Sequence, residues 1–297
     1  MKRLISSNAS ELMSYNAQEL KQSIKASEGR TICAENVAVR EAFIGDITGA
    51  EIARAFGADI ILLNAVDVLN PQLAGIENQK DFVRELKHLV ARPIGVNLEP
   101  IDKDADMMEN ALEISKGRTV NEESMKALDK LGMDFVCLTG NPGTGVTNKT
   151  ITEAIKLAKE HFNGLIIAGK MHSSGVDEPV SSKESIEAFI EAGADIILVP
   201  AVGTVPGYDS EQLKEAVKTA HSHGALVMTS IGTSQEGSSR DTIKYIAIEN
   251  KICGVDIQHI GDAGYGGLAP VENIFELSVA LRGIRHTVSM MSRSINR

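Results

Sequence analysis

Several polar side chains stand at the ends of apolar runs, where they could act on a ligand. Glu35 follows one such run, Glu99 ends another just before a proline, and Lys170 and His172 end a third. Carboxyl groups can transfer protons, and a lysine beside them can act as general base, imine-forming nucleophile or phosphate ligand. We therefore predict these four residues as catalytic groups. A structural pairing of Lys170 with Glu99 is the alternative.

A second polar set is predicted to bind the hydroxyl groups of a substrate. Side chains of a strand alternate between its two faces, and on each run the polar residues share one face while the other face is apolar. The polar faces cluster at the carboxyl ends of the strands, where barrel enzymes place their active sites. The predicted substrate-binding residues are Asn64, Asn97, Thr139, Asn141, Asp262 and His259.

The same alternation rule assigns the residues of the fifth apolar run to two faces. Lys170 and His172 share a face with Ala168, whereas Ile167 and Met171 form the apolar set. Because apolar sets suit contact with surrounding helices, Lys170 and His172 are predicted to point into the centre of the fold.

Two glycine-rich loops follow the last two apolar runs, over 230–238 and 260–267. Glycine lets backbone N–H groups approach an anion, and loops after strands seven and eight of a barrel often bind phosphate. Asp262 opposes this prediction, since a carboxylate repels phosphate. The predicted phosphate-binding residues are Gly232, Thr233, Ser234, Gly261, Ala263 and Gly264.

The histidine spacing gives only a weak metal signal, because His172 and His259 stand in no His-x-His or His-x-x-x-His pattern, and the one His-x-His pair, His221 and His223, falls late in a predicted helix and is assigned no role. The residues that could nevertheless hold a divalent ion such as Mg²⁺ or Mn²⁺ are Asp67, Glu99, His172 and His259.

These residues would be positioned by eight strand–helix units. Helices between strands imply parallel pairing, since parallel neighbours need a crossover. The chain is therefore predicted to be a single α/β domain over 1–297, a (β/α)8 barrel, with an open doubly wound sheet as the alternative. The predicted strands are 31–38, 59–65, 93–99, 134–141, 165–172, 195–201, 225–231 and 255–261.

The second and sixth units repeat one short pattern, since 57–66 resembles 193–202. A duplicated half-barrel would produce this offset, and so would a common helix-to-strand turn, in which glycine ends the helix.

The two ends of the chain add helical and basic segments. Apolar residues at helical spacing predict an amphipathic helix over 9–28, within an N-terminal extension over 1–30 that could close the bottom of the barrel. A basic tail over 284–297 carries apolar residues that could pack under the barrel or exchange with a neighbouring subunit, so a homo-oligomer is expected.

Composition narrows the choice of partners. The 297 residues carry a formal charge of −10 and only 4% aromatic residues, which argues against a nucleic-acid surface. No apolar run has the length of a membrane span, and the first residues turn polar too early for a secretion signal. We expect a cytoplasmic protein with three reduced cysteines, Cys33, Cys137 and Cys253.

Five segments together resemble a known group of proteins, a bacterial family of uncharacterised barrel proteins. Its members are often labelled haloacid dehalogenase-like hydrolase or phosphoenolpyruvate phosphonomutase-like. The resemblance covers nearly the whole chain, and it implies a barrel without an established reaction. The segments are 92–100, 138–146, 168–172, 230–237 and 259–265.

Both labels imply motifs that can be compared with these residues. A dehalogenase would need Asp-x-Asp-x-Thr or Asp-x-Asp-x-Val after a buried strand, and the sequence over 102–106 ends in Asp106 instead. The phosphonomutase-like families carry a Gly-Asp-Ser turn after an early strand, where this chain has Asn64-Ala65-Val66-Asp67. The dehalogenase activity is therefore rejected, and a barrel related to the phosphonomutase-like families remains the expectation.

Three functions fit these observations. The first is an enzyme acting on a small phosphorylated metabolite, of the sugar-phosphate aldolase, isomerase or epimerase type. The second is a metal-dependent lyase or mutase that resembles the phosphonomutase group. The third is a barrel that binds a phosphorylated ligand without catalysis.

Overall fold

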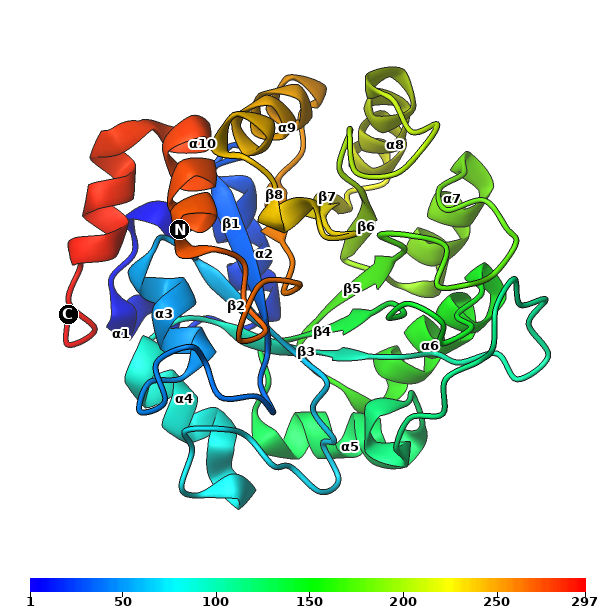
Figure 1. Ribbon diagram of the computed structural model, residues 1–297, viewed down its shortest axis with the longest axis horizontal. Helices are drawn as coiled ribbons and strands as arrows, with labels where there is room; N and C mark the ends of the chain where they lie inside the picture. The colour runs from blue at the N-terminus through cyan, green and yellow to red at the C-terminus, as the bar shows by residue number, and fades with distance from the viewer.

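The computed structural model describes residues 1–297 and forms a closed barrel of eight parallel strands, ringed by helices (Figure 1). Each strand pairs with the next in sequence, and β8 pairs with β1. The predicted (β/α)8 barrel is therefore confirmed. The strands are β1 Thr31–Val37, β2 Ile60–Asn64, β3 Ile94–Leu98, β4 Phe135–Leu138, β5 Leu165–Gly169, β6 Ile196–Pro200, β7 Leu226–Ile231 and β8 Ile257–Ile260.

The outer helices begin and end at residues whose chemistry explains their bounds. Thr48, Thr147 and Ser182, for example, cap the free N–H groups of the helices that follow them. Gly132 and Gly193 end helices in the left-handed conformation that glycine favours. The helices are α3 Gly49–Ala55, α4 Phe82–Val90, α5 Glu122–Leu131, α6 Asn148–His161, α7 Lys183–Ala192, α8 Ser210–Ser222, α9 Arg240–Cys253 and α10 Val271–Ser292.

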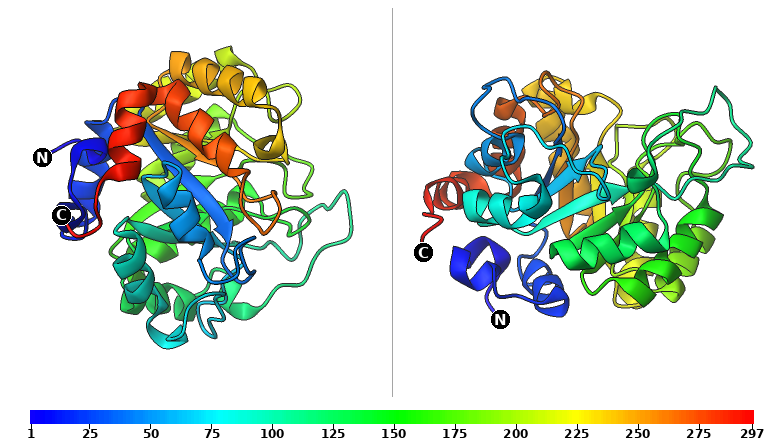
Figure 2. Two further views of the ribbon diagram at one scale, coloured as in Figure 1. Left: turned by 60° about the vertical axis from the view of Figure 1, so that its left-hand side comes forward. Right: turned by 90° about the horizontal axis from the view of Figure 1, so that it is seen from below.

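The N-terminal extension closes the bottom of the barrel, as Figure 2 shows. It holds a 3-10 turn and two helices, α1 Ala9–Leu12 and α2 Ala17–Lys25, where the sequence predicted one helix over 9–28. The break has a local cause, because Asn16 accepts a hydrogen bond from the Glu19 N–H and starts a new helix. Apolar side chains of this extension then pack into the lower part of the barrel interior.

The C-terminal segment is more ordered than a tail. Helix α10 runs on to Ser292 across a kink at Gly283, whose φ is 72°. Arg293 then donates hydrogen bonds to the Ser6 carbonyl and the Asn8 side chain, so this segment packs beneath its own barrel.

One arrangement of hydrogen bonds around an aspartate recurs four times at the bottom of the barrel. The residue just before each even-numbered strand is an aspartate, and its carboxylate accepts a hydrogen bond from a backbone N–H of the preceding strand. Each aspartate also contacts a basic side chain from a helix. The pairs are Asp59 with Arg282, Asp134 with Lys87, Asp195 with Lys21 and Asp256 with His221.

This aspartate arrangement accounts for the repeated sequence pattern at 57–66 and 193–202. It occurs at all four even strands, and the aspartate backbone N–H also bonds back to the carbonyl of the same neighbouring residue. The repeating unit is therefore a pair of strands joined at their starting ends.

None of the helices has the length and the apolar character needed to cross a bilayer.

Candidate active site at the barrel mouth

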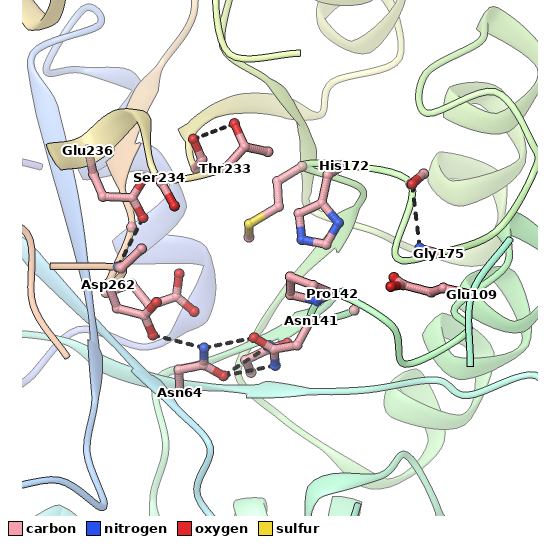
Figure 3. Close-up of a pocket in the computed structure, with 18 residues that line it drawn as sticks. Asn64, Glu109, Asn141, Pro142, His172, Gly175, Thr233, Ser234, Glu236 and Asp262 are labelled. Atoms are coloured by element: carbon pink, nitrogen blue, oxygen red, sulfur yellow. Dashed lines mark hydrogen bonds between the residues drawn. The ribbon is translucent and has the colours of Figure 1, made fainter. Parts of the chain in front are cut away.

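A cavity of about 390 Å³ opens at the carboxyl ends of the strands (Figure 3). It contains four carboxyl groups and three amides, and no lysine or arginine lines it. With four carboxyl groups and no lysine or arginine, the cavity offers no permanent cation to balance an anionic ligand. Its ionisable and amide residues are Glu35, Asn64, Asn97, Glu109, Asn141, His172, Glu236 and Asp262.

An amide network forms one wall of this cavity (Figure 3). Asn64 and Asn141 each donate to the other's side-chain oxygen, at 3.0 and 3.1 Å. The Asn64 amide also donates to the Asp262 carboxylate at 2.9 Å, and Asn97 donates to Asn64 at 3.4 Å. The Asn97 side-chain oxygen is buried without a partner. The network brings together three predicted binding amides and fixes their orientation.

Glu99 holds this network from behind the cavity wall. Its carboxylate accepts from the Asn141 backbone N–H at 2.8 Å, from the Asn141 amide at 2.9 Å and from Arg118 at 2.8 Å. Only 1% of Glu99 is exposed, and it does not line the cavity. The predicted pairing with Lys170 is thus wrong, because Arg118 is its partner. Glu99 is placed to position Asn141 rather than to contact a ligand.

Three carboxyl groups beside this network have raised pKa values. Burial raises the pKa of Glu35 to about 8, and the nearby Glu236 and Glu99 carboxylates add to the shift. Burial and then Glu35 raise the pKa of Asp262 to about 7, while the Asn64 hydrogen bond lowers it. Burial also raises the pKa of Glu236. At neutral pH the mouth therefore holds carboxyl groups able to give and to accept protons.

His259 lies behind Glu35 and outside the cavity lining, which corrects its prediction as a binding residue. Its Nδ1 shares a hydrogen bond of 2.8 Å with the Ser230 hydroxyl. Its Nε2 lies 3.0 Å from a Glu35 oxygen, but without the angles of a hydrogen bond. Burial lowers the pKa of His259 to about 4, so the ring is neutral beside a protonated Glu35.

The predicted phosphate position is filled by a carboxylate of the chain itself. Glu236 accepts a hydrogen bond from the Ala263 backbone N–H at 3.0 Å, between the loops after β7 and β8. A Cβ on Gly261 would lie 2.5 Å from the same oxygen, so the loop needs glycine to admit Glu236. An anion at this place would displace Glu236 and face Asp262, which corrects the predicted phosphate site.

The other predicted loop residues are divided. Gly232, Thr233 and Ser234 line the cavity, and Thr233 donates its hydroxyl to the Thr204 carbonyl at 2.7 Å. Gly264 does not line the cavity. A Cβ at this position would lie 2.0 Å from the Leu268 carbonyl oxygen. Gly264 is therefore explained by close packing of its own loop.

Lys170 faces away from the cavity, which overturns the predicted faces of β5. Ile167 and Met171 belong to the apolar cluster inside the barrel, whereas Ala168 packs in the outer layer. Lys170 follows the phase of Ala168, is 1% exposed, and forms an ion pair with Glu178. The prediction assumed that polar residues face inward, but the loop after β5 supplies a carboxylate on the outer side.

His172 lines the cavity even though it shares this sequence phase, because β5 already ends at Gly169 and the chain turns. Its Nδ1 accepts a hydrogen bond from the Ser174 backbone N–H at 3.0 Å. Burial, followed by the charge of Lys170, lowers the pKa of His172 to about 4. The ring is therefore neutral at the mouth.

Thr139 is fully buried and does not line the cavity, and its hydroxyl has no partner. The prediction that Thr139 binds a hydroxyl of the ligand is thus not supported by its position.

The four residues considered for a metal ion do not meet. Asp67 instead accepts from the Leu69 and Asn70 N–H groups in its own turn. No group of three or more histidine, cysteine, aspartate or glutamate side chains is arranged to hold a metal. Because these donors do not fit a metal ion, we derive no step through one.

A second cavity of about 560 Å³ adjoins the first and shares three of its wall residues, His172, Ser173 and Thr233. No aspartate, glutamate, lysine or arginine lines it. Its walls combine hydroxyl and apolar side chains, among them Ser181 and Tyr208. Sequence reasoning missed this cavity, and it missed Glu236 and Glu109, because loops far apart in the chain create it.

Fold and mouth together define a (β/α)8 barrel with an acidic, amide-lined cavity where barrel active sites lie. The chain belongs to the family described as domain of unknown function (DUF7916), whose model matches residues 5–297. No curated protein matches the sequence.

Three solved structures share this fold at low identity. A 2,3-dimethylmalate lyase, described as a member of the PEP mutase/isocitrate lyase superfamily, is 14% identical with a TM-score of 0.51, over 82% of this chain and 80% of that one. A provisionally assigned lyase/mutase from Burkholderia cenocepacia is 15% identical with a TM-score of 0.51, over 87% and 83%. A provisionally assigned fructose-1,6-biphosphate aldolase from Coccidioides immitis is 15% identical with a TM-score of 0.52, over 95% and 98%.

These likenesses show the barrel fold. The resemblance to phosphonomutase-like proteins therefore holds at the level of the fold, and the dehalogenase label finds no support among them.

Proposed function

We propose that the protein is an enzyme of lyase or isomerase type, which moves protons on a small hydroxylated carbonyl compound at the barrel mouth. The supporting observation is the placement of Glu35 and Asp262 on one cavity, with their pKa values raised to about 8 and about 7. General acid–base catalysis works best with pKa values near the working pH. The lyase names of two fold relatives agree with this class.

The two carboxyl groups take complementary roles. Glu35 is protonated at neutral pH and donates its proton to the carbonyl oxygen of the substrate. Asp262, which is partly ionised near pH 7, accepts a proton from the adjacent carbon or hydroxyl. Removal from carbon leaves an enediol, which is the step of an isomerase or epimerase. Removal from a β-hydroxyl lets the C–C bond break, with its electrons passing toward the carbonyl, which is aldol cleavage.

The amides bind rather than react. Asn64 and Asn141 are held by each other, by Asp262 and by Glu99, so they present fixed donors and acceptors to substrate hydroxyls. An imine mechanism needs a lysine in the cavity, and Lys170 is not there. No step therefore uses Lys170.

That the substrate carries a phosphate group remains a prediction. The first cavity has no lysine or arginine to balance a phosphate, and those of its carboxyl groups that are ionised would repel one. The phosphate would have to lie in the second cavity, which has hydroxyl groups and no acidic side chain.

Proton exchange at carbon tests the proposal even while the product is unidentified. Hydroxy-carbonyl metabolites that raise the melting temperature are incubated with the protein in D₂O, and deuterium uptake or cleavage is followed by mass spectrometry. Asp262→Asn and Glu35→Gln should each lower the rate about 100-fold or more. Asp241→Asn, which alters an exposed carboxylate on α9, is the matched control and should leave the rate unchanged.

A ligand that binds and returns without exchange or cleavage would contradict the enzyme proposal. It would favour a barrel that only binds its ligand.

A further inference from the structure

Three arginines at the bottom of the barrel lack an acidic partner. Arg54 lies on α3, Arg92 precedes β3, and Arg293 follows α10. None of them forms an ion pair with a carboxylate, and the Nε atom of each is buried without a hydrogen-bond partner. Of the two fully buried arginines, Arg92 and Arg282, only Arg282 is paired with an aspartate, and Arg54 and Arg293 are partly exposed. These elements lie on the side of the molecule where both chain ends meet (Figure 1).

Arg92 is the most unusual of the three, because only 1% of it is exposed. One guanidinium nitrogen donates to the carbonyl of the neighbouring Ala91 at 2.8 Å, and another lies 2.8 Å from the Met290 sulfur. Burial lowers the pKa of Arg92 to about 10, and the charges of Arg54, Arg282 and Arg293 lower it further against the pull of Asp59. A buried charge is costly unless it is compensated.

Three carboxylates lie near these arginines, and none of them forms an ion pair with one of the three, since Glu11 pairs with Lys2 instead. Asp59 accepts two hydrogen bonds from Arg282, at 2.7 and 2.8 Å. Glu51 caps helix α3, where it accepts from the Thr48 backbone N–H and hydroxyl at 3.0 and 2.8 Å. Arg54, Arg92 and Arg293 are therefore brought together without an ion-paired carboxylate of their own.

A cavity of about 350 Å³ opens beside these arginines. Arg54 and Arg293 line it, together with Ser292, Ser294 and the Glu51 carboxylate, which uses one of its oxygens to cap α3. Guanidinium groups bind the oxygens of phosphates and carboxylates through paired N–H donors. The protein as a whole is acidic, with a formal charge of −10, so the cavity is not part of a general basic surface.

We propose that this cavity binds a small free oxyanion, either a phosphate or a carboxylate compound, at the end of the barrel opposite the acidic mouth. Arg54 and Arg293 contact the anion, and Arg92 adds to the positive field from within the core. The site stands on its own residues and does not depend on the proposed activity. The anion would link α3 to the end of α10 and so stabilise the bottom of the barrel.

Calorimetric titration with inorganic phosphate, and separately with citrate, tests the proposal at constant ionic strength. We expect saturable binding of at least one of the two by the full chain, and an affinity at least tenfold lower in Arg54→Gln. The matched control is Arg84→Gln, which removes the same charge from the exposed surface of α4 and should leave binding unchanged. Two results would overturn the site: no saturable binding of either anion, or equal binding by both variants.

A second variant keeps the test valid if Arg54→Gln folds poorly. Ser294 is exposed on the rim of the cavity, so Ser294→Glu should fold and would place a carboxylate beside the arginines. It should raise the melting temperature in phosphate-free buffer and abolish the response to phosphate. A lower melting temperature with an unchanged phosphate response would contradict the proposal.

Discussion

At the scale of single residues, the mouth gathers groups whose ordinary charges are suppressed. Glu35 and Asp262 hold protons that they would lose in water, and His172 and His259 lack protons that they would carry at mild acidity. Burial is the main cause for all four. Functional sites commonly collect such shifted groups, since catalysis needs them near the working pH.

These shifts predict how stability changes with pH. Between pH 4.5 and about 8 the unfolded chain loses the Glu35 proton while the folded protein keeps it, so stability falls as pH rises through this window. Between pH 6.5 and about 4, His172 and His259 take up protons in the unfolded chain but stay neutral in the folded protein, so stability also falls as pH drops. Unfolding in urea should show greatest stability at roughly pH 5–6.5.

The variant Glu35→Gln should flatten the alkaline side of this curve and leave the acid side in place. Stability that rises steadily from pH 6 to pH 8 in the unmodified protein would contradict the shifts.

The sequence predicted the position of a residue correctly where strand alternation was the only information needed, while the roles of these residues stay predictions. Glu35, Asn64, Asn97 and Asn141 all line the cavity, as their strand positions indicated. It failed for Lys170, because its partner Glu178 comes from a loop whose path no local pattern encodes.

At the scale of elements, the loops after the strands decide what the mouth can bind. The loop after β3 crosses to the loops after β4 and β5, where Met108 donates its N–H to the Gly175 carbonyl and Leu112 to the Gly143 carbonyl. It thereby brings Glu109 to the cavity. The strand order and most helix positions follow from periodicity and caps, whereas these crossings depend on contacts between distant segments.

Lys170 and Glu178 are expected to fasten the loop after β5. The Glu178 carboxylate also accepts from the Asn148 N–H at the start of α6, so it joins two elements. Lys170→Met and Glu178→Gln should each lower the free energy of unfolding by about 1–3 kcal/mol, since the pair is largely buried. A double-mutant cycle by urea unfolding should show that the two losses are not additive.

The exposed pair of Lys183 and Glu187 on α7 is the control, and its cycle should give about 0.5 kcal/mol or less. Additive losses for Lys170 and Glu178 would show that their contact does not stabilise the loop.

At the scale of the whole molecule, α10 closes the helical ring through one buried ion pair. Arg282 reaches from α10 to Asp59 before β2, and both side chains are fully buried. Asp59 also accepts the backbone N–H of Ile32 in β1 at 2.8 Å. This single carboxylate therefore joins the last helix to the first two strands.

Asp59→Ala should lower the free energy of unfolding by about 3–5 kcal/mol, because it leaves Arg282 buried without a counter-charge. The effect should be strong here, since Arg92 already lies nearby without an acid partner. Asp81→Ala breaks an exposed pair with Arg84 and should change stability by about 1 kcal/mol or less. Equal unfolding midpoints for the two variants in urea would refute this ranking.

The repeated aspartates bear on how such a protein could change over time. They fasten the strands in pairs at their starting ends, at a distance from every group that faces the cavity. The alignment of the strands is thus held at their starting ends, away from the mouth. Loops at the mouth can lengthen, shorten or be exchanged among relatives, and new chemistry can arise there on an inherited frame.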